Sequence, residues 1–95
     1  MTHQTGEARA DYRVVGRVQG VGFRWWTLRA ARQLELRGSV RNCDDGSVEV
    51  RVAGTQAAID RLHAALREGP THAIVSDLLE IPSMGELPAD FRVER

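Results

Sequence analysis

The apolar residues of this chain recur with two different spacings, and the order of the two spacings restricts the fold more than any other feature. Alternation at every second residue is typical of a half-buried strand, and recurrence at i, i+4, i+7 and i+8 is typical of an amphipathic helix. The strand pattern occurs at residues 12–18, 38–42, 47–53, 73–81 and 90–93. The helical pattern occurs at residues 24–34 and 55–68. The chain is therefore predicted to run strand, helix, strand, strand, helix, strand, with a short strand at the end.

Local signals support this order and lead to a fold class. Asp45-Gly46 joins two neighbouring strands and favours a tight hairpin, and Thr55 is a suitable N-cap for the second helix. Because crossovers are right-handed, few arrangements of these elements remain. We expect an α+β fold of the ferredoxin-like split βαβ type, a sandwich with a mostly antiparallel sheet and two helices on one face.

The length of 95 residues fits one domain. We assign that domain to residues 11–95. Residues 1–10, MTHQTGEARA, are small or polar and lack an apolar period, so they are predicted to form a flexible N-terminal tail.

Composition argues against several function classes. Thirteen basic and thirteen acidic residues cancel, so the basic excess usual for nucleic-acid or membrane binding is missing, and neither partner is expected. Cys43 is the only cysteine, which excludes an intrachain disulfide and favours a reducing compartment. The three histidines are scattered along the chain, so neither a metal nor a cofactor is expected. With no signal peptide or apolar span in the sequence, the protein is expected in the cytoplasm.

The segment VQGVGFR, residues 18–24, lies between the first predicted strand and the first predicted helix. A glycine-rich turn at this place lets backbone N–H groups converge beside the positive end of a helix dipole, where an anion binds well. The segment lacks the GK[ST] ending of a Walker A loop and the third glycine of a dinucleotide-binding loop. A turn without a ligand remains possible, but Arg24 at the helix start is unfavourable unless an anion binds there.

Asn42 is the second candidate, because asparagine has a poor propensity for the strand in which it lies. It could simply introduce the hairpin turn. The predicted fold also allows it to face the VQGVGFR loop across one pocket. One of the adjacent Trp25 and Trp26 is expected to point outward, either as rim packing or as an apolar wall for a substrate.

The paired segments GRVQGVGFR, residues 16–24, and GSVRNCDDGSVEV, residues 38–50, resemble the acylphosphatase family. The resemblance covers nearly the whole chain from Tyr12 onward. It implies that Arg24 binds phosphate and that Asn42 positions the attacking water, which makes these two the expected catalytic residues. It also implies a phosphate cradle of backbone amides, formed by Gln19, Gly20, Val21, Gly22 and Phe23 together with Arg24.

Two departures from the family pattern concern packing at the end of the first helix. Glu35 replaces a usual glycine, and Ser39 stands where a larger residue is frequent.

The function implied by the resemblance is metal-free hydrolysis of acyl phosphates to a carboxylate and inorganic phosphate. The carboxylate is a good leaving group, since its conjugate acid has a pKa of about 4, so no general acid is required. We expect a monomer that acts on a small molecule. The alternatives are a non-catalytic ferredoxin-like module that binds an anion for regulation, an RNA-binding sheet, and an acylphosphatase-like domain of a larger maturation protein. Tyr12 and Phe91 are the only aromatic residues on the predicted strands, too few for an RNA-binding sheet.

Overall fold

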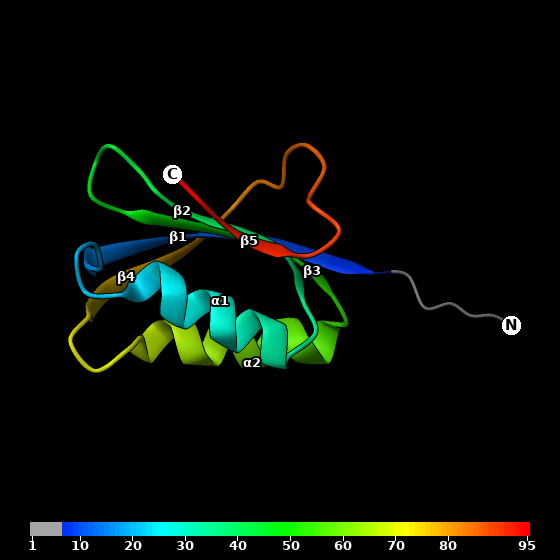
Figure 1. The fold of residues 1–95 in the computed structure, drawn as a ribbon, viewed down its shortest axis with the longest axis horizontal. Coiled ribbons are helices and arrows are strands. Elements are labelled where there is room, and N and C mark those ends of the chain that lie inside the picture. The colour runs from blue at the N-terminus through cyan, green and yellow to red at the C-terminus, as the bar shows by residue number, and fades with distance from the viewer. Residues whose placement is uncertain (1–6) are drawn as a thin grey trace, which may run out of the picture.

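The computed structural model describes residues 7–95 and shows one sheet with two helices packed against one of its faces (Figure 1). This arrangement confirms the predicted α+β, ferredoxin-like fold. The elements in chain order are β1 (Ala8–Arg17), α1 (Phe23–Gln33), β2 (Arg37–Asn42), β3 (Val48–Gly54), α2 (Gln56–Glu68), β4 (Ile74–Ile81) and β5 (Phe91–Glu94).

The strand order is β4-β1-β3-β2-β5. Strand β3 is antiparallel to both β1 and β2, β4 is antiparallel to β1, and β5 runs parallel to β2. The chain therefore leaves β1, crosses through α1 and returns as β2, and β3 then fills the gap between these two strands. This split βαβ unit brings the start of α1 to the same end of the sheet as the end of β2.

The core lies between the sheet and the helix layer. On β3 the alternating Val48, Val50 and Val52 are fully buried, as the sequence pattern predicts. Ile59, Leu62 and Leu66 form the buried stripe of α2. Thr55 precedes the first residue of α2, and its hydroxyl accepts a hydrogen bond from the Ala58 amide at 3.1 Å, which confirms the predicted N-cap.

Strand β1 begins at Ala8, four residues before the predicted start of the first strand. Ala8–Ala10 of the predicted tail pair with Gly54, Ala53 and Val52 of β3, so the assignment of these residues to a tail is wrong. Two alanines on either side of an arginine gave no hydrophobic period to detect. Their strand conformation comes from the hydrogen-bonding partner that β3 supplies. Residues 1–6 of the predicted tail lie outside the described residues.

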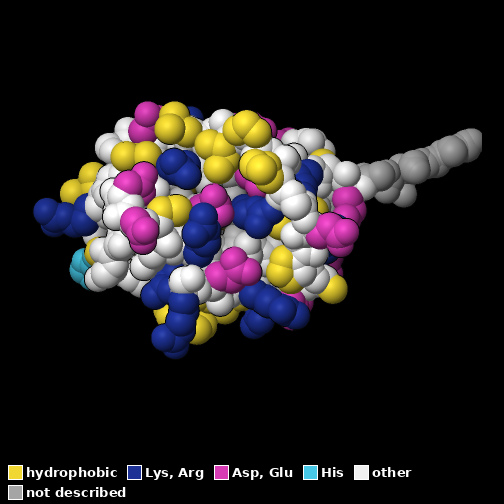
Figure 2. All heavy atoms as spheres, turned by 90° about the horizontal axis from the view of Figure 1, so that it is seen from above, with side chains coloured by type: hydrophobic (Ala, Val, Ile, Leu, Met, Phe, Trp, Pro, Cys, Tyr) yellow, Lys and Arg dark blue, Asp and Glu magenta, His cyan; other side chains and the backbone are white. Residues whose placement is uncertain are grey.

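The other face of the sheet carries charged side chains in cross-strand pairs, and Figure 2 shows arginine and acidic side chains interspersed on it. Asp11 is only 2 % exposed and binds the guanidinium groups of Arg9 and Arg51, each at 3.1 Å. Arg41 binds Glu49 at 2.9 Å on the neighbouring strands. The arginines on this face are thus largely paired with acids of the same face.

The loop between β4 and β5 lies along this charged face and is held there through its backbone. Arg9 and Arg51 both donate to the carbonyl oxygen of Met84. Arg37 donates to the carbonyl oxygens of Leu87 and Pro88, at 2.9 and 3.1 Å. The arginines of the sheet therefore fix a loop that contains no regular structure of its own.

Neither of the described helices is long and apolar enough to cross a membrane.

Candidate active site

The loop between β1 and α1 has a backbone conformation that depends on its glycines. Gly20 and Gly22 have φ values of +75° and +80°, in the left-handed region that other residues rarely adopt. A Cβ atom on either glycine would have no neighbouring atom within 4 Å. The glycines are therefore required by the turn of the chain, and the space above them is open to a ligand.

Backbone N–H groups accumulate at this loop without partners from the protein backbone. Within residues 7–95, no backbone carbonyl accepts a hydrogen bond from the amides of residues 19–23. Helix α1 begins here with Gly22 as N-cap, which provides no side-chain cap, and the first turn contains no acidic residue. An uncapped helix N-terminus with unpaired amides favours an anion.

Arg24 lies in the first turn of α1 and adds a full positive charge to this group of donors. Its Nη1 atom donates to the carbonyl oxygen of Glu94 at 3.3 Å, which places the guanidinium beside the end of β5. The neighbouring Phe23 is buried and packs on Trp26 with 5.5 Å between ring centroids, so the start of the helix is anchored in the core. Trp25, in contrast, is 56 % exposed.

Asn42 is the last residue of β2 and faces the same loop. Its Oδ1 atom is buried, and no group of residues 7–95 donates a hydrogen bond to it. A buried polar atom without a partner costs about 1–3 kcal/mol. This cost is removed if water or a ligand donates to the amide oxygen, so the position suits a residue that binds a water molecule.

These residues surround one cavity of about 110 Å³. Its walls are formed by Val18, Gly20, Gly22, Phe23, Arg24, Trp25 and Asn42. The structure thus brings together five of the predicted site residues, from two segments that are far apart in the sequence. Trp25 is the tryptophan that points outward and borders the cavity.

The side chains of the two other predicted residues of the cradle contact other parts of the protein, so only their backbone amides are available to the cavity. Val21 packs against the core cluster. The side chain of Gln19 turns toward the β2–β3 hairpin, where it hydrogen-bonds to the backbone. The backbone amide of Gln19 was predicted from the sequence, but the contact of its side chain was not, because nothing in the local pattern indicates the contact with the hairpin.

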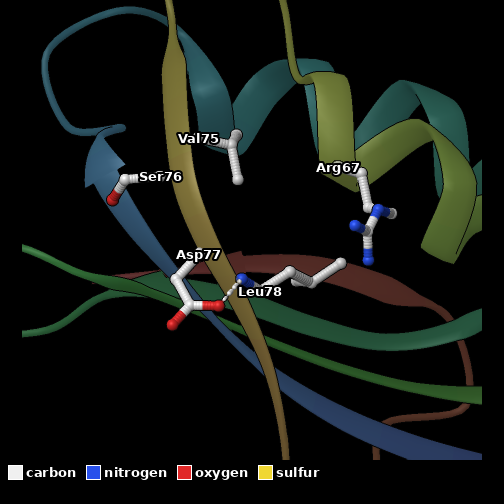
Figure 3. Close-up of a pocket in the computed structure, with 5 residues that line it drawn as sticks. All are labelled: Arg67, Val75, Ser76, Asp77 and Leu78. Atoms are coloured by element: carbon white, nitrogen blue, oxygen red, sulfur yellow. Dashed lines mark hydrogen bonds between the residues drawn. The ribbon is translucent and has the colours of Figure 1, made fainter.

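A second cavity, also of about 110 Å³, lies between the end of α2 and β4 (Figure 3). It is lined by Arg67, Val75, Ser76, Asp77 and Leu78. The hydroxyl of Ser76 already donates to the carbonyl oxygen of Val15, and Asp77 accepts from the amide of Leu78. The hydroxyl of Ser76 and one carboxylate oxygen of Asp77 are therefore already used by the neighbouring backbone.

Metal ligands do not cluster in the described part of the chain. Among residues 7–95, no three His, Cys, Asp or Glu side chains lie close enough together to hold a metal ion. Of the three histidines considered in the sequence, His3 lies outside the described residues. Cys43 is a free cysteine that is partly exposed.

Comparison with known proteins identifies a family. The sequence model of the family described as Acylphosphatase matches residues 10–93. The chain is 51 % identical over 83 residues to an acylphosphatase of Burkholderia thailandensis, covering 87 % of this chain and 81 % of that protein. It is 50 % identical over 72 residues to an acylphosphatase of Nitratidesulfovibrio vulgaris, covering 76 % and 72 % of the two chains.

Solved structures agree with the sequence comparison. The structure of an acylphosphatase from Coxiella burnetii superposes with a TM-score of 0.85 at 38 % identity, covering 93 % of each chain. The family model spans most of the chain, including both the cradle loop and the strand that ends at Asn42. The chain therefore belongs to the acylphosphatase family.

Proposed function

We propose that the cavity between the cradle loop and Asn42 hydrolyses acyl phosphates, giving a carboxylate and inorganic phosphate. The observation that carries the proposal is the convergence in one cavity of an uncapped helix N-terminus, Arg24 and the unpartnered amide oxygen of Asn42. The first two suit a phosphoryl group, and the third suits the water that attacks it. Family membership supports the same activity.

The substrate's phosphoryl group is held by the backbone amides of residues 19–23 and by the guanidinium of Arg24. In phosphoryl transfer, negative charge spreads over the equatorial oxygens of the transition state. Donors that are already oriented toward those oxygens stabilise this charge without having to reorganise. The cradle is preorganised in this sense, because its glycines allow the left-handed turn and the buried Phe23 anchors the end of the loop in the core.

Asn42 holds the water in line with the bond that breaks. The water oxygen forms a bond to phosphorus while the bond between phosphorus and the carboxyl oxygen breaks, and the electron pair leaves with the carboxylate. An oxygen of the phosphoryl group accepts the proton of the water, because an amide is not a base of useful strength. The role of Asn42 is therefore to orient the water, which raises the rate through proximity and alignment.

Two single substitutions separate binding from chemistry. Arg24→Ala is expected to weaken the binding of inorganic phosphate by about 10- to 100-fold, since hydrogen bonds to charged groups contribute about 1.5–3 kcal/mol. Arg29→Ala is a matched control, because Arg29 is exposed on the same helix. Asn42→Ala is expected to lower kcat by about 100-fold and to leave phosphate affinity nearly unchanged.

The assay is the hydrolysis of benzoyl phosphate by the purified protein, with phosphate affinity measured by titration calorimetry. If the Arg24 and Asn42 variants were as active as wild type, the assignment of both residues would be wrong. If the folded wild type bound phosphate and did not hydrolyse benzoyl phosphate, the regulatory anion-binding module would replace the enzyme.

We also propose that the protein acts as a monomer in the cytoplasm. The free thiol of Cys43 is compatible with a reducing compartment. The paired charges on the open face of the sheet leave no strong field there for a nucleic acid. Sedimentation equilibrium at micromolar concentration tests the monomer, and a dimer mass would contradict it.

A further inference from the structure

The side chain of Gln19 connects the two halves of the proposed active site. Its Nε2 group donates one hydrogen bond to the carbonyl oxygen of Cys43 at 2.8 Å and another to the carbonyl oxygen of Ser47 at 2.9 Å. A primary amide has two N–H donors, so both are used. The backbone of Gln19 belongs to the cradle loop, and the residues it binds belong to the hairpin between β2 and β3.

The two carbonyl groups lie where the hairpin closes. The amide of Cys43 donates to the carbonyl oxygen of Ser47 at 2.8 Å, and the amide of Gly46 donates to the carbonyl oxygen of Cys43 at 3.1 Å. Cys43 directly follows Asn42 in the chain. Gln19 therefore binds the backbone one residue away from the side chain proposed to hold the attacking water.

The internal shape of the hairpin depends on its own contacts, whereas the side chain of Gln19 joins the hairpin to the cradle loop. Asp45 accepts hydrogen bonds from the amide and the hydroxyl of Ser47, at 2.9 and 2.6 Å, and these bonds fix the turn internally. Within residues 7–95, Gln19 is the only residue of the 19–23 loop whose side chain hydrogen-bonds to the hairpin. The internal shape of the turn and its attachment to the cradle thus depend on different residues.

We propose that the side chain of Gln19 is a positioning residue, which sets the distance between the phosphate cradle and Asn42. This inference rests on the proposed acyl phosphate hydrolysis. The phosphoryl group is held on the Gln19 side of this contact, and the water is held on the Asn42 side. A misplacement of reacting groups by about 1 Å lowers a rate by about 100-fold, so the length of the link matters for kcat.

The substitution Gln19→Met tests the proposal, because methionine has a similar length and no N–H donors, and the backbone amide of the cradle is kept. We expect kcat for benzoyl phosphate to fall by about 10-fold or more, as expected for a partial loss of alignment. The inhibition constant of inorganic phosphate is expected to stay within about threefold, since cradle and Arg24 are retained. Gln33→Met is the matched control, since Gln33 is exposed at the end of α1, and it is expected to behave as wild type.

A double-mutant cycle with Asn42→Ala separates positioning from a general structural effect. If Gln19 acts through Asn42, Gln19→Met lowers kcat by less than about twofold when Asn42 is already alanine. An equal loss in both backgrounds would overturn the proposal. So would an unchanged kcat in the single variant, or a weakening of phosphate binding as large as the loss of kcat.

A measurement on the wild-type protein makes the test independent of whether the variant folds. In ¹⁵N-labelled protein, the side-chain NH₂ protons of Gln19 are expected to exchange with water at least 10-fold more slowly than those of Gln33. Equal exchange rates would overturn the link itself. An inactive wild type would overturn the proposed function together with this inference, whereas an active wild type with an unaffected Gln19→Met variant would overturn this inference alone.

Discussion

Glu35 has the conformation that most clearly carries a cost in this structure, and replacing it with glycine is expected to stabilise the protein. Its φ of +58° is the only positive φ at a non-glycine position among residues 7–95. The amide of Glu35 donates to the carbonyl oxygen of Arg32 at 3.1 Å, and the amide of Leu36 donates to that of Ala31 at 2.9 Å. This pair of bonds is a Schellman motif, in which the position of Glu35 is normally occupied by glycine.

The expected change in the free energy of unfolding is the sum of two stabilising contributions and one destabilising contribution. A left-handed conformation costs a residue with a Cβ about 1–2 kcal/mol. Glycine also increases the conformational entropy of the unfolded chain, and this reduces the gain in stability by about 0.4–1 kcal/mol. Removing a negative charge from the C-terminal end of α1 contributes about 0.3 kcal/mol. Glu35→Gly is therefore expected to raise the free energy of unfolding by about 1 kcal/mol, which corresponds to about 4–8 °C in Tm for a domain of this size.

The assay is urea unfolding followed by tryptophan fluorescence, together with calorimetric Tm. Glu35→Ala is the control, because it removes the charge and keeps the Cβ atom, and it is expected to gain only about 0.3 kcal/mol. The kcat of both variants should match wild type, since Glu35 lies at the opposite end of α1 from the cradle. A glycine variant no more stable than the alanine variant would refute the reasoning from backbone strain.

Three further predictions concern stability. Gly38→Ala should destabilise the fold by more than about 2 kcal/mol in urea unfolding, because Gly38 has a φ of +142° and an added Cβ would lie 1.8 Å from the carbonyl oxygen of Arg51. Gly46→Ala is the control, since Gly46 also has a positive φ but its Cβ would meet no neighbouring atom, and it should cost only about 1 kcal/mol. Equal losses of stability in the two variants would contradict the clash. Hydrogen bonds from Ser47 hold the pKa of the Asp45 carboxyl group below its usual value of 3.8 in the folded protein. The charged carboxylate therefore stabilises the folded state at pH values above 3.8, and this stabilisation is lost as the pH falls through the lowered pKa of the folded state. Asp45→Asn should therefore be less stable than wild type at pH 7 and approach it in acid unfolding as the pH falls below 3.8, and a difference independent of pH would contradict this assignment. Inorganic phosphate at 100 times its Kd should stabilise the wild type by about 2.7 kcal/mol in thermal unfolding, and a similar gain in Arg24→Ala at the same concentration would show that the ion binds elsewhere.

The layered fold could be predicted from the sequence because its elements carry strong local signals. The valines of β3 alternate cleanly, the Asp45-Gly46 turn joins that strand to β2, and Thr55 caps α2. The extension of β1 to Ala8 could not be predicted, because a segment with two alanines and an arginine becomes a strand only when a partner strand lies beside it. The local sequence of residues 8–10 does not show that β3 will lie beside it.

The candidate site was only partly predictable for a similar reason. The glycines of the cradle, Arg24 and Asn42 carry chemistry that can be recognised residue by residue, and the fold brings them to one cavity. The link from Gln19 to the hairpin depends on a side-chain direction that is fixed by tertiary structure. The exposure of Trp25 rather than Trp26 depends on the rotation of α1 about its axis, and the packing of Phe23 and Trp26 sets this rotation.

The most direct test of the account is the initial rate of benzoyl phosphate hydrolysis by wild type and Asn42→Ala in the presence of EDTA, with phosphate affinity measured on the same samples. We predict rapid turnover by wild type, a loss of about 100-fold in kcat for the variant, and equal phosphate affinity for the two proteins. Equal turnover by both would remove Asn42 from the mechanism. A folded wild type that binds phosphate without turnover would contradict the proposed catalysis.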